Sequence, residues 1–169
     1  MKTILYTTIL AGTLAALAWS EETANKTTRR HPGHRMQVQF IADKESYPSG
    51  EPVVVTLQIK NIGDSPFMFM RGGRQRGHRD NQFAFSAQQG DSMLADIGNP
   101  THFGGLGSFV SLAPNEAVHI PVDLTSWFNF TKTGRIFIRG SYYMQFVDAE
   151  GYSQIWEDFA CAEFYITIE

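Results

Sequence analysis

The chain has 169 residues, of which 43% are hydrophobic and 18% charged, and its formal net charge is -3. This length predicts one domain, and the apolar content excludes a wholly disordered chain. The negative net charge argues against nucleic-acid binding as a main function, since bulk attraction to phosphates needs positive charge. The single cysteine, Cys161, excludes an intramolecular disulfide and any zinc site built from several cysteines.

Residues 1–20 have the pattern of a secretory signal peptide. Lys2 precedes an uncharged apolar stretch over residues 4–18, and small residues follow at positions suited to signal peptidase. The stretch is short for a membrane span, which needs ~20 apolar residues. We therefore expect a secreted or periplasmic mature protein with no membrane anchor after cleavage; an uncleaved N-terminal anchor is the alternative.

Residues 21–35 are polar and lack apolar periodicity, and Pro32-Gly33 interrupts any regular element. This segment is predicted to be a disordered linker. The remaining residues, 36–169, are predicted to form one folded domain.

From residue 36 onward the hydrophobic residues recur with a period of two, which is typical of half-buried β-strands. In chain order, the alternation predicts strands at 36–40, 53–60, 118–124, 136–146 and 162–168, with weaker candidates at 66–70, 82–87 and 108–112. One helical turn is expected within 125–130, with Asp123 or Thr125 near its start. No segment has the pattern of a helix of three turns.

Turn residues separate these strands at 47–50, 61–64, 113–115 and 132–134. Seven or eight short strands with regular turns predict an all-β fold, either an antiparallel sandwich or a small barrel, and we favour a single Greek-key sandwich. The connections 71–82 and 98–107 are long, as Greek-key crossings between sheets tend to be.

Four turn and strand motifs resemble those of immunoglobulin-like sandwiches in secreted bacterial proteins. In order they are Tyr47-Pro48-Ser49-Gly50-Glu51-Pro52-Val53, then Asn61, then Leu112-Ala113-Pro114-Asn115-Glu116, then Thr133-Gly134-Arg135-Ile136-Phe137. The pattern is also similar to macroglobulin-type domains and to small bacterial proteinase-inhibitor sandwiches. It departs from the family where Asn115 replaces a glycine and Ile136-Phe137 replaces a tyrosine. The resemblance implies the fold and carries no functional residue.

The segment 71–80 combines arginines with glycines. Guanidinium groups suit phosphate, sulfate or carboxylate, so we consider this segment a candidate site for an anion or a partner. Its candidate residues are Arg71, Arg74, Arg76, His78 and Arg79. The alternative interpretation is a solvated connection between sheets.

Two aromatic residues, Phe137 and Tyr143, fall out of phase with the core positions of their strand and lie near Arg135 and Arg139. Outward aromatics beside arginine are typical of a binding face; the alternative is that the 71–107 region covers them. Cys161 is likewise predicted on the outward face of the last strand. This predicts intermolecular disulfide pairing or reactivity, unless a loop covers the thiol.

Other constellations point to no chemistry. The histidines lack the spacing of a zinc hydrolase, and no nucleophile elbow or other familiar catalytic motif occurs. We therefore expect no metal, no cofactor and no catalytic residue. The leading hypothesis is an exported, non-enzymatic binding or interaction module, inhibitor-like in character, with an exported protein or an anionic ligand as its partner. Self-association as a homodimer stays open.

Two alternatives remain. The first is a carbohydrate-binding module, in which aromatic rings stack on sugars; its candidate platforms are Trp127, Trp156, Phe137 and Tyr143. The second is a small secreted hydrolase or metal-binding protein, whose site would have to assemble from distant residues.

Overall fold

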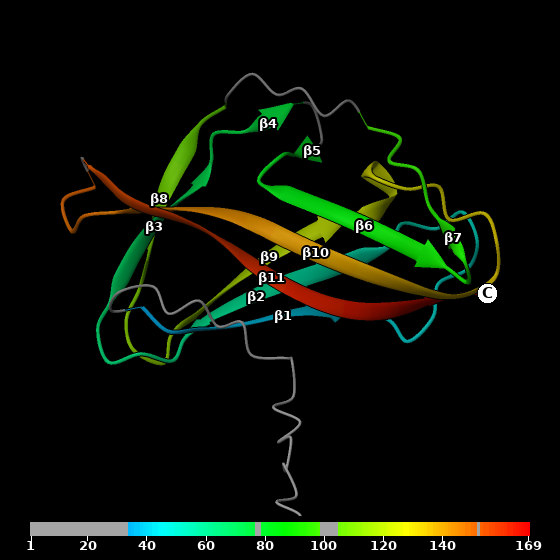
Figure 1. Ribbon diagram of the computed structural model, residues 1–169, viewed down its shortest axis with the longest axis horizontal. Coiled ribbons are helices and arrows are strands. Elements are labelled where there is room, and N and C mark those ends of the chain that lie inside the picture. Colours follow the sequence, from blue (N-terminus) through cyan, green and yellow to red (C-terminus); the bar gives the residue numbers. More distant parts are fainter. Residues whose placement is uncertain (1–33, 77–78, 99–104, 152) are drawn as a thin grey trace, which may run out of the picture.

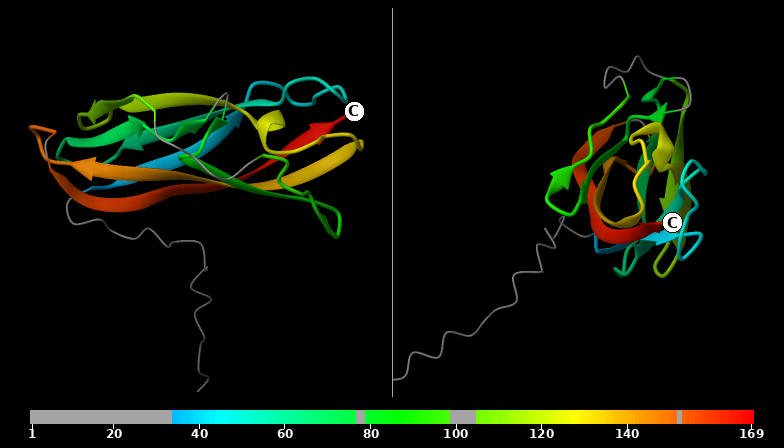
Figure 2. Two further views of the ribbon diagram at one scale, coloured as in Figure 1. Left: turned by 90° about the horizontal axis from the view of Figure 1, so that it is seen from above. Right: turned by 90° about the vertical axis from the view of Figure 1, so that its right-hand side faces the viewer.

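Two antiparallel β-sheets pack face to face in the computed structural model, which describes residues 34–76, 79–98, 105–151 and 153–169 (Figures 1 and 2). Eight of the described strands have six or more residues. The predicted all-β antiparallel sandwich is therefore confirmed. Within the described ranges, no helix is long and apolar enough to cross a membrane.

The smaller sheet has three strands in the order β1-β2-β9. Its strands are β1 (Met36–Ala42), β2 (Val54–Asn61) and β9 (Ala117–Asp123). In β2, Val55, Leu57 and Ile59 are fully buried, whereas the residues between them are half-buried. The alternation predicted from the sequence thus gives the phase of this strand correctly.

The larger sheet is built on β10 (Gly134–Val147), which pairs with β11 (Gln154–Ile168) along one edge. Two shorter strands lie end to end along the other edge of β10. Residues 137–142 pair with β6 (Phe83–Gln89), and residues 145–147 pair with β3 (Phe67–Gly72). The sheet is completed by β7 (Ser92–Met93) beside β6 and by β8 (Gly107–Leu112) beside β3.

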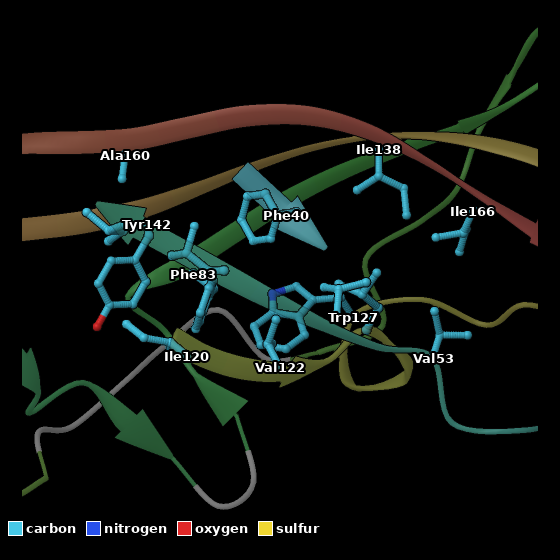
Figure 3. Close-up of a cluster of buried hydrophobic side chains, with 14 of the residues drawn as sticks. Phe40, Val53, Phe83, Ile120, Val122, Trp127, Ile138, Tyr142, Ala160 and Ile166 are labelled. Atoms are coloured by element: carbon cyan, nitrogen blue, oxygen red, sulfur yellow. The ribbon is translucent and has the colours of Figure 1, made fainter. Parts of the chain in front are cut away.

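Aromatic and β-branched side chains from both sheets fill the core (Figure 3). Phe40 of β1 stacks on Phe164 of β11, with ring centroids 5.0 Å apart. Gly140 lies beside this ring, and a Cβ there would come within 2.5 Å of Phe40 Cε2. The glycine that interrupts the alternation of β10 therefore makes room for a core aromatic.

One short 3₁₀ helix, η1 (Leu124–Ser126), follows β9 and places Trp127 in the core, where 1% of it is exposed. The Asp123 carboxylate caps η1 by accepting from the Thr125 N–H at 2.9 Å. The predicted helical turn is present one residue earlier than expected, with Asp123 at its start as predicted.

Both long connections differ from the prediction. They join strands of the larger sheet, whereas the chain crosses between sheets at 62–66, 113–116 and 124–133. The 71–82 connection also contains a small hairpin, β4 (Gln75–Arg76) with β5 (Arg79–Asp80). Strand β11 begins eight residues before the predicted 162.

The described chain contacts the sandwich from its first residues. His34, which the sequence places in the linker, lies 5.1 Å from the ring of Phe67 and 5.4 Å from that of Phe146. The carbonyl of Arg35 accepts from the Ile62 N–H at 2.9 Å. Residues 1–33, which include the predicted signal peptide and most of the linker, lie outside the described residues.

Candidate binding surface

The arginine-containing segment leaves the larger sheet at the point where β3 ends and β6 begins along β10. The buried side chain of Gln82 connects the strands there. Its Nε2 donates to the carbonyls of Met70 (3.1 Å) and Tyr143 (3.2 Å). Its Oε1 accepts from the Gly72 N–H and from the Tyr142 hydroxyl, the latter at 2.9 Å. Both ends of the segment are therefore fixed to β10.

Arg79 has a structural environment. Its Nη1 and Nη2 donate to the two carboxylate oxygens of Asp96 at 2.9 and 2.7 Å, and its side chain is only 12% exposed. Its guanidinium lies 4.6 Å from the Trp127 ring centroid. Gly98 makes this arrangement feasible, because a Cβ there would lie 1.5 Å from Nη1. Arg79 thus ties the segment to residues 96–98.

Arg71 is half-buried at the end of β3, and its positive charge attracts the Asp80 carboxylate. Burial raises the pKa of Asp80, while the Gln82 N–H and the charge of Arg71 oppose this rise. Arg76 lies in β4, and His78 lies outside the described residues. The candidate residues of this segment therefore do not form one described basic patch.

Arg74 faces the outer surface of the larger sheet. Its guanidinium lies 3.9 Å from the ring centroid of Tyr143, and it lines an open pocket of about 230 Å³ together with Met70, Gln145 and four glycines. It forms no ion pair within 4 Å and donates no hydrogen bond to the described residues, although its positive charge helps to lower the pKa of Glu157. The stacked guanidinium therefore retains donors for a group that enters the pocket.

The Tyr143 ring lies between the Arg74 guanidinium and the sheet. Only 8% of Tyr143 is exposed, and its ring also contacts Phe159 edge-on at 5.7 Å. Burial, together with a hydrogen bond to the Glu157 carboxylate, raises the pKa of Tyr143 to about 12. The same hydrogen bond, followed by one from Gln154, lowers the pKa of Glu157. Tyr143 is thus a covered support for Arg74.

Phe137 belongs to a second, separate cluster on the same face. Its ring centroid lies 5.3 Å from that of Tyr165, which is 52% exposed. The Arg135 guanidinium stacks on the Tyr165 ring, 3.8 Å from its centroid. With Gln88 and Gly90 these residues line an open hollow of about 350 Å³. Phe137 and Tyr143 are six residues apart in β10, roughly 20 Å at strand spacing, so they do not share one site.

Cys161 lies between the two clusters, opposite Ser141 of β10. It is exposed on the outward face. Desolvation and the negative charge of Asp158 raise its pKa, with Arg139 opposing them. The thiol is therefore accessible but is not activated as a thiolate.

The sequence analysis missed Tyr165, Phe159 and Glu157 as members of these clusters. Tyr165 stands opposite Phe137 and Phe159 stands opposite Tyr143 in the β10–β11 register. Only the pairing of the two strands brings them together. The predicted outward orientation of Phe137 and Tyr143 could have pointed to these partners. In a hairpin, the residues opposite outward-facing side chains also face outward.

The structure also places the residues that the two alternative functions would use. No group of three or more histidine, cysteine or acidic side chains there is arranged to hold a metal ion. Of the proposed sugar platforms, Trp127 and Tyr143 are buried, whereas Trp156 is 46% exposed and Phe137 is half-buried.

No family model and no curated protein matches the chain. Solved structures with a similar fold include the CARDB domain of the PF1109 protein from Pyrococcus furiosus in complex with di-metal ions, at 13% identity, 82% coverage of this chain, 96% of that chain and a TM-score of 0.38. Another is native α2-macroglobulin from Escherichia coli from domain MG7 to the C-terminus. It is 14% identical, with 82% of this chain and 17% of that chain covered and a TM-score of 0.44. A third is Spo0M, a sporulation control protein of Bacillus subtilis. It is 14% identical, with 79% of this chain and 49% of that chain covered and a TM-score of 0.41. These likenesses concern the sandwich fold alone, and nothing about ligand or activity follows from them.

Proposed function

We propose that this protein is an exported, non-enzymatic interaction module that binds a carboxylate of a protein partner with Arg74. The observation that carries the proposal is the guanidinium stacked 3.9 Å from the Tyr143 ring beside an open pocket. Stacking fixes the plane of a guanidinium, so less rotamer entropy is lost when a ligand binds. Its free N–H groups match a carboxylate in two-point geometry.

The shape of the segment supports an inhibitor-like role. Gln82 fixes one end of the 73–81 loop, and the Arg79–Asp96 pair holds its hairpin against residues 96–98. Residues that are held before binding lose less conformational entropy on binding, so the described parts of the loop, 73–76 and 79–81, incur a smaller cost. Such a loop can occupy a site on a partner with Arg74 at its base.

Export is part of this proposal and rests on the signal-peptide pattern of residues 1–20. The mature N-terminus is expected near Trp19 or Glu21. Intact-mass analysis of exported protein measures this directly, and retention of Met1 on exported material would refute the cleavage.

The test of binding is capture of partners from the exported proteome by mature wild-type protein and by Arg74→Gln. Capture should fall at least tenfold for the variant and should weaken with added salt, because the contact is charged. Arg135→Gln is the matched control, since Arg135 stacks on a tyrosine of the same face at 3.8 Å but lies far from the pocket. Equal capture by wild type and Arg74→Gln would contradict the proposal.

A second candidate function, carbohydrate binding, is favoured by the hollow at Phe137 and Tyr165. Two neighbouring rings and the polar groups of Arg135 and Gln88 surround it, and aromatic faces suit the apolar faces of sugars. A glycan array with wild type and Tyr165→Ala tests it. Binding that Tyr165→Ala abolishes and Arg74→Gln leaves intact would favour the sugar function.

A further inference from the structure

The free edge of β11 is the most unusual surface outside the two clusters. β11 is 15 residues long, and Figure 2 shows it along one margin of the sandwich. Among the described residues, its only pairing on the side away from β10 is the isolated bridge of Ile168 to Tyr47. β1 packs against the inward face of β11 through Phe40 and Phe164, which leaves the backbone edge uncovered by a described strand.

This edge has one feature that limits edge-to-edge pairing and lacks the others: Asp158 lies on the inward face opposite Met144, and its carboxylate accepts from the Phe159 N–H at 2.8 Å. Natural edges carry proline, lysine or inward-pointing charges, or are very short. Residues 154–168 contain no proline, glycine, lysine or arginine. Three of its large hydrophobic side chains are exposed, namely Trp156 (46%), Phe159 (57%) and Tyr165 (52%). The length of this strand and its exposed rings favour pairing with a second strand.

We propose that a second copy of this chain pairs with β11 antiparallel, edge to edge, with Cys161 opposite itself. If two copies of β11 form one antiparallel sheet, the two-fold axis that relates them runs perpendicular to the sheet. At this axis one residue lies opposite its own copy, and that residue defines the register of the whole pair. The regular free edge runs from Trp156 to Ile166. It is bounded at one end by the register shift near Gln154 and at the other by the hydrogen bonds of Tyr47 to Thr167 and Glu169. Cys161 is the midpoint of that edge.

The backbone phase agrees with this register. The Tyr47 N–H donates to the Thr167 carbonyl, and the Glu169 N–H donates to the Tyr47 carbonyl, both at 2.9 Å. Odd-numbered residues therefore direct their N–H and C=O groups toward the free edge, because these directions alternate along a strand. Cys161 and its copy would exchange both hydrogen bonds, with Cα atoms about 5.5 Å apart.

Charge also favours the register. With Cys161 self-paired, each acidic residue of the edge faces an uncharged residue of the second copy: Glu157 with Tyr165, Asp158 with Phe164, and Glu163 with Phe159. A centre at Ala160 would instead place Glu157 opposite Glu163. Like charges directly opposite one another destabilise a strand pair.

This dimer would join the two larger sheets into one and turn both outer faces to the same side. The two Arg74 pockets would then face one partner surface together. Two linked sites can bind far more tightly than one without any new contact.

The first test measures the mass of the full chain by sedimentation against concentration. Wild type should shift from one to two chain masses. Glu163→Pro removes an N–H that points to the free edge and leaves the β10 ladder intact, so it should stay monomeric. Glu163→Ala loses the same ion pair to Arg139 but keeps the N–H, and it should dimerise like wild type. Wild type that stays monomeric at all concentrations, or equal dimerisation of both variants, overturns the proposal.

The second test probes the register without relying on proline. Phe159→Glu puts like charges opposite each other at two symmetric places and should weaken dimerisation by roughly tenfold. Phe159→Lys loses the same ring but faces Glu163, so it should dimerise more tightly than Phe159→Glu. Equal dimerisation of the two variants overturns the register.

The third test uses diamide as an oxidant to trap neighbouring thiols. Wild type should form a Cys161–Cys161 disulfide, since the expected Cα separation lies within disulfide range. The control is Ser86→Cys in a Cys161→Ser background, because Ser86 is exposed on the same outer face. Cross-linking no faster than in the control contradicts the pairing. A monomer with slow hydrogen exchange at the N–H groups of residues 157, 161, 163 and 165, which point to the free edge, would instead show that another segment of this chain covers it.

Discussion

Replacement of Gln82 by leucine should be among the most destabilising single changes in this protein. Leucine keeps a similar volume but leaves four buried polar groups without their partner: the Met70 and Tyr143 carbonyls, the Gly72 N–H and the Tyr142 hydroxyl. An unsatisfied buried group costs about 1–3 kcal/mol. Because the ends of β3 and β6 can partly relax, we expect a loss of about 3–5 kcal/mol, a large share of a typical domain's ~5–15 kcal/mol.

Urea unfolding monitored by tryptophan fluorescence measures this loss, since Trp127 is buried in the folded state. Gln88→Leu is the matched control: Gln88 lies in β6, the strand that Gln82 immediately precedes, is exposed, and donates to the Gly90 carbonyl. It should change the free energy of unfolding by less than about 0.5 kcal/mol. A loss below about 1 kcal/mol for Gln82→Leu, with an unchanged urea dependence, would refute the role of Gln82 as the connector of the two strands.

Three further predictions concern other parts of the fold. Arg79→Met should be less stable than wild type at pH 7, and the difference in the free energy of unfolding should shrink as pH falls to 3. The hydrogen bond from Arg79 lowers the pKa of Asp96 in the folded state. The resulting stabilisation is present above the pKa that Asp96 has in the unfolded chain, and it is lost as pH falls through the pKa of the folded state. Urea curves at several pH values check it, and a constant difference would contradict it. Gly140→Ala should cost about 1–3 kcal/mol, because its Cβ would meet Phe40 at 2.5 Å; an unchanged melting temperature would show that the ring moves freely. Leu57→Ala should cost about 2–5 kcal/mol in chemical denaturation, and an equal loss at its polar neighbours would mean that the strand phase is wrong.

The sequence predicts a strand well where one face is buried and the other is not. β2 and the first half of β10 meet this condition, so Leu57 and Ile138 could be placed in the core from alternation alone. The first half of β11 does not meet it. Trp156 and Phe159 are both exposed there although they lie on opposite faces, because an edge strand beside the end of a sandwich has solvent on both sides.

The candidate site was harder to predict because it depends on contacts between distant residues. The arginine cluster pointed to a segment, but its composition could not show that Arg79 pairs with Asp96 while Arg74 stacks on Tyr143. Both partners are far away in sequence, and the choice depends on where the hairpin folds back. Cys161 could be assigned to the outward face because its neighbours Ala162 and Phe164 fixed the phase of the strand.

The end-to-end placement of β3 and β6 along β10 bears on how this protein can evolve. Met70 faces Gln145 and Phe83 faces Tyr142, so the intervening chain leaves and re-enters the sheet at nearly the same place. Residues inserted between Gly72 and Gln82 would change the register of no strand in the two packed sheets. Long surface loops add little closure entropy, and loops on a rigid scaffold tolerate variation. Related chains can therefore present different loops, and meet different partners, on an unaltered sandwich.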